Sequence, residues 1–221
     1  MRAPQRKVHS LYGRGLAAQR QGRTREALSF YNRVLRIDPE HPKTLNNLGY
    51  LHYRKKRYLD AAVHFRLALK KNPLFALAWM NLGNTYYVQA RYHEAIAAYR
   101  RVLIIRPGHF YAHFNTGNSY YKMGSWKNAA EFYRGALRNN RVAVNAYFNL
   151  GLALLRQNKS DAARSQFIQV LRLDDDHAFA HYEIARLYHN EQRLDLARTH
   201  YRRACRKGHA QSCRNDKKIG G

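Results

Sequence analysis

The stretch Trp79-Met80-Asn81-Leu82-Gly83 occurs in related form at two other places in the sequence. The two relatives are Leu45-x-x-Leu48-Gly49 and Tyr147-x-x-Leu150-Gly151. They lie at multiples of 34 residues from it, which indicates an internal repeat of that length. With Val8 as the first position, the chain divides into six repeats, a basic extension at 1–7 and a basic tail at 212–221. The six repeats are 8–41, 42–75, 76–109, 110–143, 144–177 and 178–211.

Two positions of the repeat hold only small residues, and a third holds only aromatic ones. The eighth position is Gly15, Gly49, Gly83, Gly117, Gly151 and Ala185, and the twentieth is Ala27, Ala61, Ala95, Ala129, Ala163 and Ala197. Antiparallel helices approach closely where side chains are small, so these positions predict a crossing of two helices within each repeat. The bulk beside the crossing comes from the twenty-fourth position, which is Tyr31, Phe65, Tyr99, Tyr133, Phe167 and Tyr201.

The rest of the pattern predicts helices and no strands. Apolar residues recur at helical spacing, as in Leu45, Leu48 and Leu51, and short polar turns separate the periodic segments. Proline at the thirty-second position ends the second helix of the first three repeats. We therefore predict one continuous all-α array of about twelve helices of about 13 residues, in which each repeat touches mainly its neighbours.

These columns resemble the tetratricopeptide repeat over nearly the whole chain, and the third repeat carries the family pattern almost completely. Its matching residues are Trp79, Leu82, Gly83, Tyr86, Ala95, Tyr99 and Pro107. The resemblance implies a right-handed α-solenoid superhelix whose concave side is lined by the first helix of each repeat. Such surfaces commonly bind peptides or partner proteins. The resemblance therefore favours a protein-interaction scaffold or adaptor that needs no cofactor.

Asparagines recur on the side of the first helix that faces away from the second. The sixth position holds Asn47, Asn81, Asn115 and Asn149, and the ninth adds Asn84 and Asn118. An amide offers one acceptor and two donors, so it can pair with the main chain of an extended segment of any sequence. Similar asparagine ladders hold peptides in several tetratricopeptide repeat proteins, and the resemblance implies the same role here. The alternative is that these side chains cap or brace the backbone of the next repeat.

Aromatic and basic side chains accompany the asparagines on the same predicted surface. Tyr53, Tyr87 and Tyr121 share the twelfth position and suit a groove wall, although packing against the neighbouring helix explains them nearly as well. Positive charge comes from Lys43 at the second position and from Arg54, Lys122 and Arg156 at the thirteenth. An extended segment that is acidic or bears a free carboxylate therefore suits the groove.

The net charge raises a rival function. The chain carries 40 Lys and Arg against 14 Asp and Glu, a formal charge of +26, which suggests an acidic partner. Basic residues also keep a long, thin array in solution, so the excess has a second explanation. On the second helices, Arg66, Arg100 and Arg134 share the twenty-fifth position. A solvated basic face explains this ridge, and the rival function is nucleic-acid binding on the convex side.

Little in the sequence points to catalysis or to metal binding. It contains no Ser/His/Asp arrangement, phosphate-cradling glycine loop or paired-carboxylate motif, so we expect no enzyme. His109 with His113, and His177 with His181, have a spacing that could share a metal. Both pairs fall in columns that hold aromatic packing residues in other repeats. We therefore expect packing roles and no metal.

The two cysteines lie near the end of the chain, at Cys205 and Cys213. Their spacing resembles that of cysteine-bearing Sel1-like repeats, which implies a disulfide between a second helix and the helix that follows. The basic start is not followed by the apolar core of a secretory signal, and no apolar run has the length of a membrane span. A cytoplasmic protein with two reduced thiols is therefore expected. Its terminal repeats lack an obvious cap and allow self-association.

Overall fold

The computed structural model describes residues 3–220, and within this range the regular secondary structure consists of thirteen α-helices. The all-α prediction is confirmed. The helices divide between an N-terminal unit that ends at Pro107 and a C-terminal unit that begins at Gly108. The N-terminal unit contains α1 (Ala3–Arg20), α2 (Thr24–Ile37), α3 (Pro42–Arg54), α4 (Tyr58–Lys71), α5 (Ala76–Val88) and α6 (Tyr92–Ile105). The C-terminal unit contains α7 (Phe110–Lys122), α8 (Trp126–Asn139), α9 (Val144–Leu155), α10 (Ser160–Leu173), α11 (Ala178–Asn190), α12 (Leu194–Arg206) and α13 (Ala210–Gly220).

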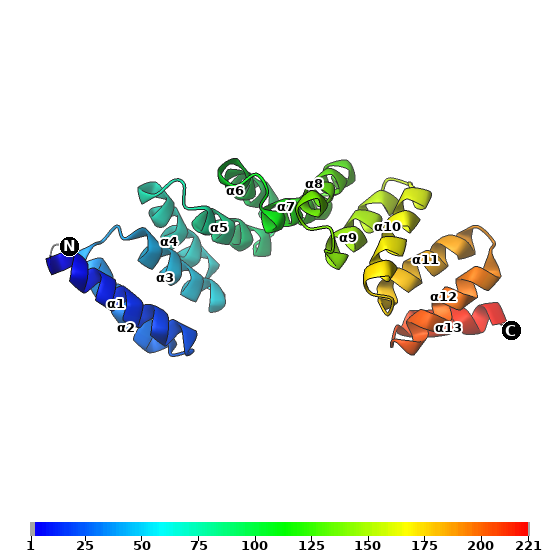
Figure 1. The fold of residues 1–221 in the computed structure, drawn as a ribbon, viewed down its shortest axis with the longest axis horizontal. Coiled ribbons are helices and arrows are strands. Elements are labelled where there is room, and N and C mark those ends of the chain that lie inside the picture. Colours follow the sequence, from blue (N-terminus) through cyan, green and yellow to red (C-terminus); the bar gives the residue numbers. More distant parts are fainter. Residues whose placement is uncertain (1–2, 221) are drawn as a thin grey trace. The chain divides into compact units, whose positions relative to one another are not determined.

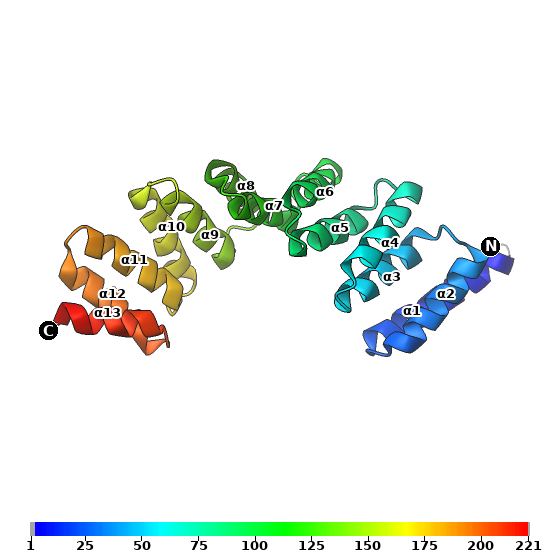
Figure 2. The ribbon, with the colours of Figure 1, turned by 180° about the vertical axis from the view of Figure 1, so that it is seen from behind.

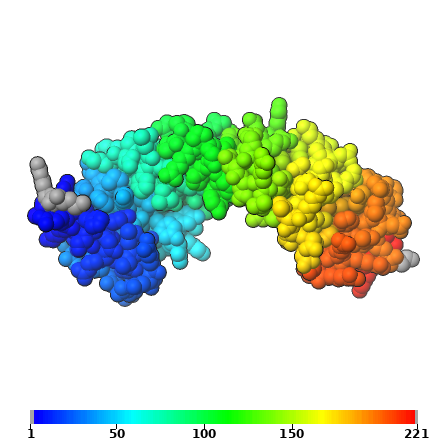
Figure 3. Space-filling view, viewed as in Figure 1, coloured from blue at the N-terminus to red at the C-terminus, as the bar shows by residue number. Residues whose placement is uncertain are grey.

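Within each unit, consecutive helices form antiparallel pairs joined by short turns (Figures 1 and 2). The pairs are α1/α2, α3/α4 and α5/α6 in the N-terminal unit, and α7/α8, α9/α10 and α11/α12 in the C-terminal unit. Successive pairs within a unit also touch, as α4 touches α5 and α8 touches α9, so each unit is a continuous stack (Figure 3). Helices α3, α5, α7, α9 and α11 each begin at the first position of a 34-residue repeat.

The contact between the eighth and twenty-fourth positions sets the packing within the pairs. In the first five repeats the aromatic ring lies directly against the glycine, and a Cβ atom added to that glycine would come closer than 3.0 Å to the ring. The rings themselves are almost completely buried, as are the alanines at the twentieth position. The structure thus places the helix crossing where the small columns predicted it.

Both ends of the described chain are helical, where the sequence predicted an extension and a tail. α1 starts at Ala3, next to Pro4, whose fixed φ and missing N–H group suit the first turn of a helix. At the other end, α13 covers most of the predicted tail and packs against α12. Gly208 turns the chain between these two helices with a φ of +85°, a conformation that glycine adopts readily. α13 therefore covers a face of the last helix pair that the sequence analysis left uncapped.

A disulfide joins Cys205 of α12 to Cys213 of α13, with Cα atoms 4.7 Å apart. The expectation of two reduced thiols is therefore wrong for this structure, and the disulfide implied by the Sel1-like spacing is present. The physical reason is the tight turn at Gly208, which brings α13 back against α12 and places the two side chains opposite each other. Asp216 of α13 adds ion pairs to Arg198 and Arg202 of α12, each 3.2 Å long.

Replacing Gly83 by alanine should lower the free energy of unfolding by roughly 1–3 kcal/mol, because the new methyl group would overlap the buried ring of Tyr99. Gly13 on α1 provides a matched control, since it is exposed and a Cβ added there meets no atom within 4 Å. Gly13→Ala should stabilise the protein by roughly 0.5–1 kcal/mol through helix propensity. Urea unfolding followed by circular dichroism measures both changes. Equal effects in the two variants would contradict the packing argument.

Replacing Cys213 by serine should destabilise the α12–α13 contact by roughly 2–3 kcal/mol, because the disulfide no longer restricts the unfolded chain. Amide hydrogen exchange should rise in α13 and stay unchanged in α1–α6, since repeat arrays open locally. A reductant should bring the unaltered chain to the level of the variant and should leave the variant as it is. Protection of α13 that responds to neither change would show that the disulfide does not hold this helix.

Candidate peptide-binding surfaces

The predicted ligand-facing side chains lie on the first helices of the repeats. These helices are α1, α3 and α5 in the N-terminal unit and α7, α9 and α11 in the C-terminal unit. We call the two faces that they present the N-terminal and C-terminal first-helix surfaces. The predicted asparagines on them are all half-buried: Asn47, Asn81 and Asn84 on the former, and Asn115, Asn118 and Asn149 on the latter.

On the N-terminal surface, asparagine amides form a chain of hydrogen bonds from one repeat to the next. Asn81 on α5 donates through Nδ2 to Asn46 Oδ1 on α3 at 3.0 Å, and Asn46 Nδ2 donates to Asn47 Oδ1 at 3.3 Å. Asn47 Nδ2 then donates to the hydroxyl groups of Tyr31 at 3.1 Å and Tyr12 at 3.3 Å. The side-chain NH2 group of Asn47 therefore donates within the protein, in agreement with the alternative that these asparagines brace neighbouring repeats. The side-chain oxygen of Asn81, Oδ1, receives no hydrogen bond from the part of the chain that is described, so it can accept one from a ligand.

Tyrosines at the twenty-fourth position form the buried end of these networks. Their hydroxyl groups donate as follows: Tyr31 to Gln19 Oε1 at 2.7 Å, Tyr99 to Asn84 Oδ1 at 2.8 Å and Tyr133 to Asn118 Oδ1 at 2.8 Å. Burial raises the pKa of Tyr31 to about 12, so its hydroxyl stays protonated and able to donate. Asn84 and Asn118 therefore satisfy a buried hydroxyl group, a role that the sequence analysis missed.

The sequence did contain a signal for this role. In the third and fourth repeats the twenty-fourth position is tyrosine and the ninth is asparagine, whereas beside Phe65 and Phe167 the ninth position is Tyr50 and Leu152. Phenylalanine has no hydroxyl group to satisfy, so no amide is needed beside it. On the C-terminal surface, Asn149 Nδ2 also donates to Asn118 Oδ1 at 3.1 Å. Within residues 3–220 the side-chain oxygen of Asn149, Oδ1, accepts no hydrogen bond, which makes this residue the counterpart of Asn81.

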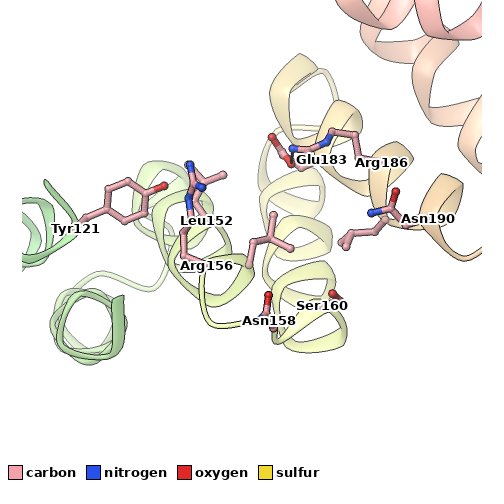
Figure 4. Close-up of a pocket in the computed structure, with 10 residues that line it drawn as sticks. Tyr121, Leu152, Arg156, Asn158, Ser160, Glu183, Arg186 and Asn190 are labelled. Carbon is pink, nitrogen blue, oxygen red and sulfur yellow. Dashed lines mark hydrogen bonds and ion pairs between the residues drawn. The ribbon is translucent and has the colours of Figure 1, made fainter. Parts of the chain in front are cut away.

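The C-terminal first-helix surface contains a pocket of about 400 Å³ lined by α7, α9, α11 and the start of α10 (Figure 4). Arg156 and Arg186 bring positive charge to it, and Tyr121 lines the side formed by α7. Glu183 is only 12% exposed and pairs with Arg186 at 2.9 Å. Burial raises the pKa of Glu183. The apolar lining consists of Leu152, Leu155 and Leu187.

A pocket of about 440 Å³ lies in the equivalent register of the N-terminal unit. Both pockets are formed by the twelfth, thirteenth, fifteenth and seventeenth positions of one repeat and the ninth, tenth and thirteenth positions of the next. In the N-terminal pocket Arg20, Arg54 and Lys55 are exposed, and no acidic residue contributes to its lining. Two of the predicted basic residues, Arg54 and Arg156, therefore lie in matching pockets.

Sequence models of the tetratricopeptide repeat match residues 12–73, 76–109, 114–169 and 148–211, which together span most of the chain. The chain belongs to the tetratricopeptide repeat family. No curated protein matches it in sequence. Membership of this family supports a role as a protein-interaction scaffold.

Solved structures share this tetratricopeptide repeat fold at low sequence identity. The structure of pilF from Pseudomonas aeruginosa matches with a TM-score of 0.76 at 20% identity, over 93% of each chain. YrrB, described as a TPR protein with an unusual peptide-binding site, matches with 0.73 at 22% identity, over 85% of this chain and 97% of its own. MamA from Desulfovibrio magneticus RS-1 matches with 0.72 at 20% identity, over 77% of this chain and 97% of its own.

The tyrosines at the twelfth position of the tetratricopeptide repeats pack against the aromatic residue that opens the second helix. The ring centroids lie 5.6 Å apart for Tyr53 and Tyr58, 5.6 Å for Tyr87 and Tyr92, and 4.9 Å for Tyr121 and Trp126, each pair edge to face. The packing alternative is therefore present in the structure. The three tyrosines remain half-buried on the first-helix surfaces, so part of each side chain stays available for contact.

Basic residues lie on both kinds of helix in this tetratricopeptide repeat protein. Lys43, Arg54, Lys122 and Arg156 are exposed on or beside the first helices, and Arg156 lies 5.7 Å from the Trp126 ring. The second-helix ridge of Arg66, Arg100 and Arg134 is also exposed. Within residues 3–220, no helix combines the length and the apolarity that crossing a bilayer requires.

Four histidines cap the helix that follows them: three lie at the last position of a tetratricopeptide repeat, and His209 lies two positions earlier in the sixth repeat. His41, His109, His177 and His209 each accept, through Nδ1, a backbone N–H bond of 3.1–3.3 Å from the third residue of that helix. Burial lowers the pKa of His41 and His209, which keeps Nδ1 free to accept. The sequence predicts packing roles for His109 and His177 and does not reveal that both cap helices. Among the described residues, no three His, Cys, Asp or Glu side chains form a group that could hold a metal.

His181 and His200 pair between α11 and α12 in a way that requires the His181 ring to be neutral. His181 Nε2 lies 2.9 Å from the Asp175 carbonyl and so must donate, which leaves its Nδ1 to accept from His200 Nδ1 at 2.8 Å. Burial, then His181 and Arg203, lower the pKa of His200 to about 4. Burial also lowers the pKa of His181, and the Tyr188 ring packs against His200 at 5.9 Å.

Acidification should therefore destabilise the C-terminal unit. The unfolded chain takes up a proton at His200 near pH 6.5, whereas the folded chain does so only near pH 4. The stabilisation is complete above pH 6.5 and is lost as the pH falls from 6.5 toward 4. Chemical unfolding at a series of pH values measures this loss. His200→Phe, which places at this position the residue found at Phe132, should flatten the curve. An unchanged pH dependence in the variant would show that another group is responsible.

Proposed function

We propose that this tetratricopeptide repeat protein is a scaffold that holds extended, acidic segments of partner proteins on its first-helix surfaces. The observation that carries the proposal is the recurrence of a basic pocket in one register of both units, with volumes of about 400 and 440 Å³. Each pocket has room for a side chain of a bound segment.

The charges at the pockets favour carboxylates. Arg20, Arg54 and Lys55 surround the N-terminal pocket without an acidic neighbour in its lining. In the C-terminal pocket the single acid, Glu183, is paired with Arg186, which leaves Arg156 to meet a ligand. Arginine binds carboxylates through two parallel hydrogen bonds, so these positions support recognition of Asp, Glu or a chain terminus.

The asparagines supply contacts that do not depend on the sequence of the segment. The side-chain oxygens Oδ1 of Asn81 and Asn149 accept no hydrogen bond within residues 3–220, while their side-chain NH2 groups donate to the preceding repeat. Each side chain is therefore fixed with its acceptor free to meet a main-chain N–H group. Of the asparagine ladder predicted from the sequence, the proposal therefore uses the side-chain oxygens of Asn81 and Asn149.

Changing Arg54 and Arg156 to glutamate should weaken capture of protein partners by roughly tenfold, because it places like charges opposite the carboxylates of the bound segment. Affinity capture from lysate at physiological salt, with nuclease present, measures the effect by quantifying each retained protein. The double variant Arg33→Glu, Arg134→Glu is the matched control, since it changes the net charge equally but on the second helices.

The outcomes of this comparison separate the candidate surfaces. Loss of a defined set of proteins in the first variant, with retention in the control, supports the first-helix surfaces. Loss in the control variant alone, or removal of all captured material by nuclease, would overturn the proposal and point to the basic second-helix ridge instead.

A further inference from the structure

A second groove, of about 560 Å³, lies on the other side of the N-terminal unit and is lined by α4, α5 and α6. We call it the repeat-3 groove, because most of its lining comes from the third repeat. Leu69, Leu82 and Ala98 form an apolar, buried floor, and Trp79 and Tyr86 contribute aromatic rings. It shares no lining residue with the first-helix pocket of the same unit, so it is a separate feature.

The groove exists because one column of the repeat holds a small residue only here. The twenty-third position is Phe30, His64, Ala98, Phe132, Gln166 and His200 in successive repeats. All of these except Ala98 carry a long or aromatic side chain. Ala98 ends at its Cβ atom, so the space that the other side chains fill remains open in the third repeat.

The missing side chain has a defined aromatic partner in three of the other five repeats. At the eleventh position, His52, Tyr120 and Tyr188 carry rings that pack against the twenty-third position of the same repeat. The centroid distances are 4.9 Å for His52 and His64, 5.5 Å for Tyr120 and Phe132, and 5.9 Å for Tyr188 and His200. The third repeat has Tyr86 at the eleventh position but no ring at the twenty-third. Tyr86 is thus left, within residues 3–220, without the ring contact that its equivalents have.

An arginine beside Tyr86 does not replace that contact. Arg91 lies over the Tyr86 ring at 4.5 Å, and Arg193, at the same position of the sixth repeat, lies over Tyr188 at 4.9 Å. In the sixth repeat the arginine and the ring of His200 both pack on the tyrosine. His200 and the arginine therefore contact different parts of the Tyr188 ring. In the third repeat the space that corresponds to His200 is not filled, and it forms part of the groove.

The rim of the groove is positively charged. Arg66, Lys70 and Arg101 line it, and the described residues give none of them a carboxylate partner. The one acid of the lining, Glu94, is paired with Arg91 at 2.7 Å. A ligand that brings negative charge to the rim would therefore meet three available cations.

We propose that the repeat-3 groove is a docking site for a partner-protein segment that inserts an aromatic side chain between flanking carboxylates. The aromatic ring would take the position that Phe132 and His200 take in their own repeats and would pack against Tyr86. The carboxylates would pair with Arg66, Lys70 and Arg101. The site adds a second binding surface to the scaffold and does not depend on the first-helix surfaces.

A short synthetic peptide with one central phenylalanine between aspartates and glutamates is the probe for this site. The chain has only two tryptophans, so nuclear magnetic resonance of their indole N–H groups reports on the groove through Trp79, with Trp126→Phe assigning the signals. The peptide should shift the Trp79 signal saturably. A peptide with alanine in place of the phenylalanine should bind roughly tenfold more weakly, because it leaves the groove unfilled.

Ala98→Phe is the decisive variant, because it gives the third repeat the side chain that Phe132 gives the fourth. It should fill the groove and abolish the Trp79 response, while the thermal stability is retained or raised. Lys70→Glu, Arg101→Glu tests the rim through surface positions alone and should weaken binding at least as much as loss of the phenylalanine. Ala98→Ser keeps the groove open and should bind as the unaltered chain does.

Three results would overturn the proposal: no saturable shift of Trp79, equal affinity for the phenylalanine and alanine peptides, or full binding by both the filled and the charge-reversed variants. Arg54→Glu, Arg156→Glu should leave the Trp79 response unchanged. If that variant also removed the Trp79 response, the peptide would be binding to the first-helix surfaces or responding to the net charge of the protein. Loss of partner capture by that variant with an intact Trp79 response would separate the two sites.

Discussion

The aromatic ring that packs on a glycine in each of the first five repeats is the contact on which the other features rest. It brings the two helices of a repeat together, because a Cβ atom at the eighth position would overlap the ring. Where the ring is tyrosine, its hydroxyl is buried with it and needs an acceptor. Asn84 and Asn118 meet that need, and Asn118 in turn receives the amide of Asn149. The close packing of the helices thus also fixes the orientation of asparagine side chains at the surface.

The distinctive surfaces arise where one repeat departs from the others. Ala98 opens a groove at a column that is elsewhere filled, and Glu183 places a carboxylate that is only 12% exposed where four other repeats have asparagine. A regular array would present the same surface at every step and would select poorly among partners. The departures give particular repeats their own shape and charge while the helix crossings, and so the fold, stay the same.

The positive charge of the binding surfaces follows from the small number of acidic residues and from the ion pairs that these residues form. Several pair with nearby cations, as Glu94 does with Arg91, Glu183 with Arg186 and Asp216 with Arg202. The first-helix pockets and the rim of the repeat-3 groove therefore retain unpaired arginine and lysine. These unpaired cations lie beside apolar and aromatic side chains, an arrangement that agrees with the proposed binding of protein segments that carry both acidic and apolar groups.

The sequence by itself determined the repeat length, the helix pairs, the small and aromatic columns and the family, because a short period makes every packing rule visible several times. The positions of the first helix that face away from the second helix also follow from helical geometry. Only the tertiary structure decided which polar atoms those positions leave free, since Asn47 and Asn81 share a column yet differ in their partners on adjacent helices. It also decided that the tail forms α13 bound by a disulfide, and that Ala98 leaves a groove beside Tyr86. These features depend on contacts between helices. The sequence gives the side chains of each repeat, but it does not show which side chains of other helices they contact.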